Sequence, residues 1–373
     1  MRLVKADLDQ FRNLVTQTVN LHPHYNLLVG KNGQGKTNFL EAIGFLGTLK
    51  SFRSASRWEI IRRGSDLCRV SGTIQGQGVS RSASFSLTRK GRNQYLDGEK
   101  VASPEKYLNA VRVVSFIPED VGLVSGPPSW RRRIVDRSVF EVWPEYVRDY
   151  RQYLRALRQR NSLLRNGNFS VEEMESWNRS LAECGGTLVR KRTLLLSRVN
   201  PVMGEVGSFL GLESGIHLAY QSSFKNADDL PGDLAGSSSE LSEAILRKLK
   251  ETQNREKEIG HTVVGPHRDN IVFANEEGDM GRYSSQGQKR GAVLSFKLAL
   301  ARVVRDVRDV WPLVLLDDVS SELDATKREA LGGLVRRMDA QFIISTTAEE
   351  PQFLDRQDGY VFRVEKGLLK QLQ

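Results

Sequence analysis

The chain has 373 residues, of which 55 are Lys or Arg and 45 are Asp or Glu, so its formal net charge is +10. This length predicts two domains or one large domain with an insertion, and the 39% share of hydrophobic residues excludes a disordered or collagen-like chain. Two cysteines are too few for a disulfide framework, and no apolar run approaches the roughly 18 residues that cross a bilayer. Because the N-terminus lacks the apolar core of a signal peptide, we expect a cytoplasmic protein with no membrane attachment. The positive net charge favours a polyanionic partner, although charge alone supports nucleic acid only weakly.

A buried strand, a glycine-rich turn and an amphipathic helix are expected near the N-terminus. The mostly apolar residues 25–29 predict the strand, and residues 38–49 carry apolar side chains at helical spacing. Between them, residues 30–37 read GKNGQGKT and match the phosphate-loop pattern G-x-x-x-x-G-K-[ST]. In such a loop the main-chain N–H groups converge on a phosphate, and the following helix presents its positive N-terminus to the same anion.

The phosphate-loop pattern predicts a nucleotide site. Its members are Gly30, Lys31, Asn32, Gly33, Gln34, Gly35, Lys36 and Thr37. Lys36 would reach the β- and γ-phosphates, and the hydroxyl of Thr37 would coordinate Mg²⁺. The alternative is a glycine-rich turn before an ordinary helix, which the flanking strand and helix disfavour.

Two acidic residues follow another predicted buried strand. Residues 312–316 are continuously apolar and lead into Asp317 and Asp318, at the strand end where a parallel sheet places its ligands. Asp317 would hold Mg²⁺, directly or through water, and Asp318 would orient or deprotonate the attacking water. A solvated strand end is the alternative when this stretch is considered alone. Because 287 positions separate Gly30 from Asp317, the two motifs span far more than one strand–helix–strand unit.

Serine and small residues at positions 284–288 open a predicted helix before this second strand. Such a helix N-terminus forms an anion site, but the stretch by itself favours the alternative, an ordinary N-cap. Residues 321–324 follow the acidic pair, and residues 341–345 predict a further buried strand.

The middle of the chain is predicted to be mainly helical. Apolar residues at alternating spacings of three and four predict helices over 147–164 and 174–195, folded back on each other. Pro201 is expected to end the second helix. Residues 244–258 have the composition of another helix.

Strands are expected to return after the helices, at residues 262–264 and 271–273. The predicted organisation is therefore a head formed by residues 1–118 and 262–373, interrupted by a helical domain over residues 119–261. The serine-containing stretch would lead the helix that returns to the head.

Positive charge gathers in the middle segment. Between residues 131 and 165 there are ten Arg and four acidic residues. Four of these arginines share one face of a predicted helix and are candidate contacts for DNA phosphates: Arg148, Arg151, Arg155 and Arg158. A solvated helix face is an equally weighted alternative. The histidines and cysteines have no metal-site spacing, and a structural role is expected for His267.

Together these motifs resemble those of ABC-type ATPases and the heads of SMC-like chromosome proteins. They are more similar still to the RecF family of bacterial recombination and replication-repair proteins, in a pattern that runs nearly the whole length of the chain. Its parts are Phe11-Arg12-Asn13, Asn32-Gly33-Gln34-Gly35-Lys36-Thr37-Asn38 with Leu40-Glu41-Ala42, Lys50-Ser51-Phe52-Arg53, Pro118-Glu119-Asp120, Arg131-Arg132-Arg133, Gly265-Pro266-His267-Arg268-Asp269, Ser285-Gln286-Gly287-Gln288 and Leu316-Asp317-Asp318. The resemblance implies an α/β fold, an ABC-type phosphate-loop ATPase head with mixed sheets and an inserted, mainly helical domain.

The resemblance also extends the predicted site. It implies ATP and Mg²⁺ as ligands, with Lys36 and Asp318 as catalytic residues and Thr37 and Asp317 at the metal. Residues that would meet a nucleotide across a dimer interface are Ser285, Gly287, Gln288 and Asp324, and further candidates for nucleotide contacts are Asn38, Arg12 and Arg53. Asp318 stands where a longer Glu is usual in transporters, so we expect slow hydrolysis, with ATP mainly gating dimerisation.

The function implied by the resemblance is an ATP-gated homodimer that binds DNA at gaps and at junctions of single and double strands. It would help to load recombinase in recombinational repair and replication-fork maintenance, with RecR as protein partner and RecO and RecA in the same pathway. The alternatives are a nucleotide-gated transport subunit and a purely structural chromosome-binding protein with a vestigial nucleotide site.

Overall fold

The computed structural model describes residues 1–53, 56–76, 78–108, 110–212, 215–224, 237–319, 325–347 and 358–372. The chain divides into two compact units. Unit 1 comprises Met1–Val121, Val206–Leu212 and Ser285–Gln373, and unit 2 comprises Gly122–Glu205 and Glu213–Ser284. No helix in the part of the chain that the structure describes is long and apolar enough to cross a membrane.

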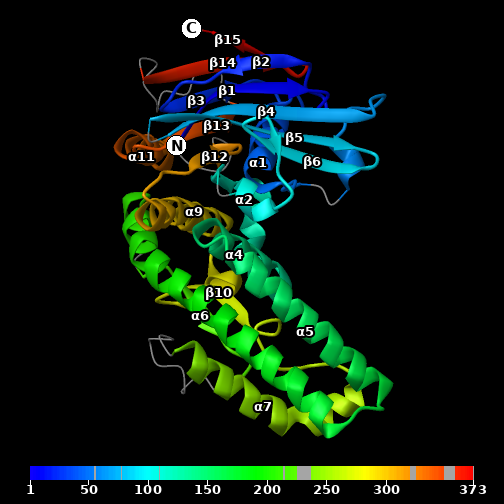
Figure 1. Cartoon of the computed structure of the whole chain (residues 1–373). Helices are drawn as coiled ribbons and strands as arrows, with labels where there is room; N and C mark the ends of the chain where they lie inside the picture. Colours follow the sequence, from blue (N-terminus) through cyan, green and yellow to red (C-terminus); the bar gives the residue numbers. More distant parts are fainter. Residues whose placement is uncertain are drawn as a thin grey trace. The chain divides into compact units, whose positions relative to one another are not determined.

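Unit 1 contains an antiparallel sheet with the strand order β2-β1-β4-β5-β6-β7 (Figure 1). Its strands are β1 (Arg2–Asp9), β2 (Gln17–Asn20), β4 (Leu67–Gly76), β5 (Val79–Thr88), β6 (Gly91–Leu96) and β7 (Glu99–Lys100). In β4, buried and more exposed residues alternate, as in a strand with one face toward a core.

A second sheet in unit 1 has the order β15-β14-β3-β13-β12-β8. Its strands are β3 (Tyr25–Val29), β8 (Val113–Phe116), β12 (Leu313–Leu316), β13 (Gln341–Thr346), β14 (Gly359–Glu365) and β15 (Leu368–Gln371). The pairs from β14 across to β8 are parallel, whereas β14 and β15 form an antiparallel hairpin. All residues of β3, β8, β12 and β13 are buried, which explains why continuous apolar runs predicted these strands. The mixed sheets of the expected α/β fold are confirmed.

Helix α1 (Lys36–Thr48) lies between the two sheets of unit 1 (Figure 1). Phe39, Ile43 and Leu46 are fully buried and belong to the same apolar cluster as residues of both sheets. A Cβ atom at Gly47 would lie 2.1 Å from Val113 Cγ2, so this glycine permits the close approach of α1 to β8.

The other helices of unit 1 are short or flank the second sheet. They are η1 (Arg57–Glu59), α2 (Pro104–Leu108), η2 (Pro118–Val121), α9 (Gln286–Arg308) and α11 (Ala325–Arg337). A mostly buried ion pair of 3.1 Å joins Lys297 Nζ on α9 to Asp120 Oδ2 on η2.

Unit 2 is mainly helical and also contains a three-stranded sheet. Its helices are α3 (Gly122–Ser125), α4 (Pro128–Val142), α5 (Tyr146–Asn166), α7 (Ser238–Ile259), α8 (Met280–Tyr283) and most of α6 (Val171–Phe209), whose last residues fall in unit 1. The strand order is β11-β10-β9, from β9 (His217–Gln221), β10 (Asn270–Asn275) and β11 (Gly278–Asp279). A Cβ atom at Gly186 would lie 2.3 Å from Ser242 Oγ, so this glycine lets α6 and α7 pack closely.

The prediction that Pro201 ends the second long helix is wrong, because α6 continues through Pro201 to Phe209. The buried side chains of Val199 and Met203 flank the proline, and the side chain of Asn200 bonds the main-chain N and O of Leu218 at 2.9 and 3.0 Å. These tertiary contacts outweigh the single helical hydrogen bond that proline removes.

The expected return to the head at residue 262 also differs from the structure. The strand predicted at 262–264 is absent, since the main-chain N–H groups of Thr262 and Val263 donate to the side chains of Asn161 and Glu256 instead of to a neighbouring strand. Strand β10 pairs with β9, and residues up to Ser284 therefore cluster with unit 2.

Candidate functional site

The phosphate loop connects β3 to α1 at the carboxyl end of the parallel strands. Gly33 and Gly35 have φ values of +79° and +118°, which favour glycine and allow the turn. The buried Lys36 side chain folds back over the loop, and its Nζ donates to the carbonyl oxygens of Gly30 and Lys31 at 2.6 and 3.0 Å. Burial lowers the pKa of Lys36, while Asp318 and Asp317 oppose this shift. The ammonium group is therefore held inside the loop, where an anion would neutralise it.

Asp317 lies on one side of the loop, held by hydroxyl groups from two neighbouring elements. Thr37 Oγ1 donates to Asp317 Oδ1 at 3.0 Å, and Ser345 Oγ on β13 donates to the same oxygen at 2.6 Å. Ser345 Oγ also accepts from the main-chain N of Asp318 at 2.8 Å. The structure thus brings Thr37 together with the acidic pair Asp317 and Asp318, which begins 280 positions later in the sequence. It also adds Ser345, which the sequence patterns did not identify.

The donors at this position suit a hard divalent cation. They are carboxylate and hydroxyl oxygens, and burial raises the pKa of Asp317, with a smaller contribution in the same direction from the charge of Asp318. Among the residues that the structure describes, no cluster of three or more His, Cys, Asp or Glu side chains could hold a metal ion. The oxygens of Thr37 and Asp317 suit Mg²⁺, which is typically bound by one or two protein oxygens together with substrate phosphates.

Arg12 and Arg53 approach the first turns of α1. The Arg12 guanidinium donates to both oxygens of the buried Glu41 carboxylate. Its Nε donates to Oε2, and its Nη2 donates to Oε1 at 2.7 Å. Arg53 Nη1 donates to Asn38 Oδ1 at 3.1 Å. Arg12 thus has an ion-pair partner on α1, whereas Arg53 is exposed beside Asn38.

The stretch Ser285–Gln288 forms the N-terminus of α9 as a complete capping box. Ser285 Oγ accepts from Gln288 N at 3.2 Å, and Gln288 Oε1 accepts from Ser285 N at 2.7 Å. The N-cap that was the alternative interpretation is therefore present. Because the serine oxygen acts as acceptor in the cap, its own proton stays available for an anion. Gly287 is exposed next to it, and Asp324 lies outside the described residues.

The four arginines predicted to share a face of α5 are all exposed: Arg148, Arg151, Arg155 and Arg158. Several other arginines of the same sequence segment bind protein groups inside unit 2. Arg131 donates to Asn270 Oδ1 at 3.0 Å, and Arg132 donates to the Asp269 carbonyl oxygen at 2.7 Å. Only part of the positive charge counted in the sequence therefore faces solvent.

His267 lies in the interior of unit 2. Its Nδ1 is hydrogen-bonded with Tyr153 OH and its Nε2 with the Thr262 carbonyl oxygen at 3.2 Å. Burial lowers the pKa of His267 to about 4. Both ring nitrogens have protein partners, in agreement with the structural role expected for this residue.

A buried polar network that the sequence patterns did not identify surrounds this histidine. Arg192 binds both carboxylate oxygens of Asp136, at 2.7 and 2.9 Å, and donates to the Pro266 carbonyl oxygen at 2.7 Å. Asp269 accepts from Tyr220 OH and from Ser223 Oγ at 2.5 and 2.6 Å. The only signal in the sequence was the block Gly265–Asp269 itself, whose partners come from distant segments.

Comparison with known proteins places the chain in a family. A family model described as the RecF/RecN/SMC N terminal domain matches residues 2–367. The chain is 35% identical over 351 residues to the DNA replication and repair protein RecF of Myxococcus xanthus (strain DK1622), which covers 93% of this chain and 91% of that protein. The chain belongs to the RecF/RecN/SMC family, and within it to the RecF proteins. The resemblance inferred from the motifs is confirmed.

Solved structures agree with this membership. The structure described as the recombination mediator protein RecF-ATP in the RecFOR pathway has a TM-score of 0.87 and 27% sequence identity, and 99% of each chain is covered. An Smc head domain derived from Pyrococcus furiosus, with an extended coiled coil and bound to the C-terminal domain of ScpA, has a TM-score of 0.54 at 14% identity, with 100% of this chain and 96% of that chain covered. The second likeness concerns the fold alone. The fold of this RecF protein is that of an ABC-type ATPase head with a helical insertion, as expected.

Proposed function

We propose that this RecF protein binds ATP with Mg²⁺ and that ATP gates a homodimer that binds DNA in recombinational repair and replication-fork maintenance. The observation that carries the proposal is the hydrogen-bonded group of Thr37, Asp317 and Ser345 beside the phosphate loop. The likeness to a RecF structure described with ATP supports it.

The residues of the loop have distinct roles in this proposal. The main-chain N–H groups from Gly30 to Asn38 surround the phosphates, and Lys36 exchanges its two carbonyl partners for the β- and γ-phosphates. Thr37 and Asp317 hold Mg²⁺, which when bound neutralises charge on the transferring phosphate. Arg53 reaches the nucleotide from its position beside Asn38, and Arg12 contributes through Glu41 and α1.

Hydrolysis is proposed to be slow and to reset the dimer. Asp318 holds the attacking water, and its carboxylate is one methylene shorter than the Glu usual in ABC transporters. The main-chain N of Asp318 is fixed by Ser345 Oγ, so the backbone does not move to compensate for the short side chain. Turnover as fast as that of transporters would contradict this part of the proposal.

Dimerisation is proposed to place one protomer's α9 N-terminus on its partner's nucleotide. The Ser285 proton that the capping box leaves available would donate to the γ-phosphate, with Gly287, Gln288 and Asp324 at the same interface. ATP would then be bound between two chains, which couples nucleotide binding to assembly.

DNA is the proposed partner of the exposed face of α5. Gaps and junctions of single and double strands are the proposed DNA targets, and loading of recombinase is the proposed outcome. RecR is the proposed direct protein partner, RecO and RecA act in the same pathway, and the cytoplasm is the proposed location. The description of the solved relative as a recombination mediator in the RecFOR pathway supports the role in recombination.

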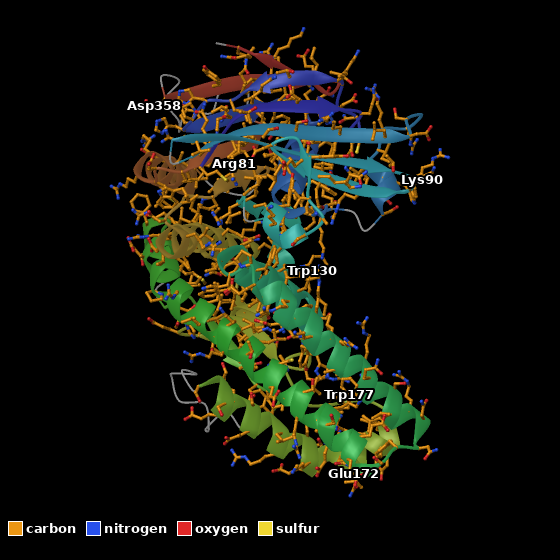
Figure 2. All side chains as sticks on the ribbon, viewed as in Figure 1. Arg81, Lys90, Trp130, Glu172, Trp177 and Asp358 are labelled. Carbon is orange, nitrogen blue, oxygen red and sulfur yellow. The ribbon has the colours of Figure 1, made fainter. Side chains whose placement is uncertain are left out.

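The nucleotide part is tested with Lys36→Ala. We expect loss of Mg²⁺·ATP binding and of ATP-dependent dimerisation, measured by equilibrium binding and by light scattering. Lys90→Ala is the matched control, because Lys90 is an exposed lysine of the same unit (Figure 2). If Lys36→Ala still dimerises in the presence of ATP, the proposal is wrong. ATP turnover that disappears in Asp318→Asn would argue against a purely structural, vestigial site.

The DNA part is tested by changing Arg148, Arg151, Arg155 and Arg158 together to Gln. If all four contact phosphates of duplex DNA, the slope of log K against log salt concentration becomes shallower by about 3 to 4. The control changes four exposed basic residues of α7 to Gln: Arg247, Lys250, Arg255 and Lys257. Equal effects of the two sets would show that α5 has no special part in DNA binding.

A further inference from the structure

The turn between β14 and β15 contacts the phosphate loop from the far end of the chain. Its two residues, Lys366 and Gly367, have φ values of +49° and +81°. The Lys366 N–H donates to Gln34 Oε1 at 2.8 Å, and the Gly367 N–H donates to the Gln34 carbonyl oxygen at 2.8 Å. Gln34 is thus bonded twice, by side chain and by main chain, to residues more than three hundred positions away.

The turn is also held by residues 13–17, which follow β1 and end at the first residue of β2. Gln17 Nε2 donates to the Gly367 carbonyl oxygen at 2.7 Å, and Gln17 Oε1 accepts from Leu369 N at 2.9 Å. A Cβ atom at Gly367 would lie 2.1 Å from the Asn13 carbonyl oxygen. Main chain therefore packs directly on main chain there, and no side chain would fit at Gly367.

The same two segments touch the loop at other points. A Cβ atom at Gly30 would lie 2.5 Å from the Val364 carbonyl oxygen of β14, so β14 packs against the beginning of the loop. The side chain of Asn13 donates to the Gly33 carbonyl oxygen at 3.4 Å and accepts from Asn38 Nδ2 at 2.7 Å. The beginning, the tip and the end of the loop are therefore each held by residues that the loop pattern does not specify.

We propose that the β14–β15 turn is a positioning element of the nucleotide site and that Gln34 is the residue through which it acts. A loop whose N–H groups converge on an anion is costly to order when the anion is absent. The hydrogen bonds from Lys366 and Gly367 hold Gln34 in place before a phosphate binds. Less of the loop then has to become ordered on binding, so binding costs less conformational entropy. The inference rests on the proposed binding of ATP, and it assigns Gln34 no contact with the phosphates through its side chain.

Gln34→Met tests the proposal in the full-length chain, because methionine keeps the length of the side chain and removes the acceptor. Loss of one net hydrogen bond predicts Mg²⁺·ATP binding about three- to tenfold weaker, with the thermal unfolding temperature changed little. Lys370→Gln is the matched control, because Lys370 is an exposed residue of β15 in the same hairpin. The substitution leaves the bonds between the turn and Gln34 intact, so its ATP affinity should equal that of the wild type.

Hydrogen exchange of the wild type gives a second readout that needs no variant. If the turn and the loop are coupled, ATP binding must stabilise the turn, and the amides of Gly367 and Leu369 should exchange several-fold more slowly with Mg²⁺·ATP. Wild-type ATP affinity in Gln34→Met, an equal loss in Lys370→Gln, or unchanged exchange of these amides would overturn the proposal. A wild type that binds no ATP would instead overturn the proposed function, and this inference with it.

Discussion

Arg158 and Arg160 lie two positions apart on α5, yet their surroundings are opposite. Arg158 is exposed, whereas Arg160 has no exposed surface and donates to Asn178, Thr262 and Glu256 at 2.6, 2.8 and 2.7 Å. Two positions on an α-helix are about 200° apart, so one side chain points to solvent and the other into the core of unit 2. The charge of a segment therefore says little about which charges a ligand meets.

The buried member of the pair is part of a pattern in unit 2. Arg192 has 2% of its side chain exposed and is fully bonded to Asp136 and Pro266. These arginines tie helices and loops together as structural residues. The exposed arginines of α5 present their side chains to solvent instead, where a partner can contact them. This contrast leads to three predictions, from the largest expected effect to the smallest.

Arg160→Met should destabilise unit 2 strongly. The substitution leaves the buried Glu256 carboxylate without its cation, and loss of one partner of a buried ion pair costs about 3–5 kcal/mol. Urea unfolding followed by circular dichroism measures the change. The double variant Arg160→Met, Glu256→Leu should recover much of the stability, because neither charge then remains in the core. If Arg160→Met lowers the free energy of unfolding by less than about 1 kcal/mol, Arg160 and Arg158 differ less in their structural role than their burial indicates.

His267 predicts a second effect, on the pH dependence of stability. Its pKa is lowered from 6.5 to about 4 in the folded state. The unfolded chain therefore binds a proton on this residue that the folded chain does not, and the free energy of unfolding falls as the pH drops from about 6.5 toward 4. The full contribution is at most about 3 kcal/mol.

His267→Gln isolates this contribution from those of neighbouring groups. Burial raises the pKa of Asp269, whose contribution has the opposite sign, and the charges of Arg132, Arg192 and Arg268 face the same region. All of these groups remain in the variant. The difference between the two stability curves should therefore shrink as the pH falls through this range, and a constant difference from pH 7 to pH 4 would contradict a neutral, buried imidazole.

Sequence patterns predicted correctly the elements that depend mainly on residues close together in the sequence. Residues 25–29 were expected to form a strand and are β3, because a strand buried on both faces is apolar throughout and a glycine follows it. Pro201 was misinterpreted because the contacts that keep the helix intact come from Leu218 and the core. Residues 262–264 look like a strand in sequence, but their main-chain partners are side chains of α5 and α7.

The same distinction applies to the candidate site. The phosphate loop and the acidic pair were found from their patterns, and the structure brings Thr37 and Asp317 within 3.0 Å. Ser345 and Lys366 were not assigned to the site, and Gln34 was assigned only as a member of the loop, because the contacts of all three depend on which strands are neighbours. The order β14-β3-β13-β12 places these residues around the loop. A charge count is less informative, because it does not separate the exposed arginines of α5 from the buried Arg160.

Arg158→Gln should have the smallest effect on stability and is the sharpest contrast to Arg160→Met. Its side chain is exposed, and a substitution at such a surface position changes the free energy of unfolding by no more than about 0.5 kcal/mol. If Arg158 contacts a phosphate of duplex DNA, the same variant should make the slope of log K against log salt concentration shallower by about 0.9. A stability loss comparable to that of Arg160→Met would show that Arg158 is a structural residue like its neighbour. Unchanged stability together with an unchanged salt slope would remove Arg158 from the proposed DNA surface and leave a solvated helix face at that position.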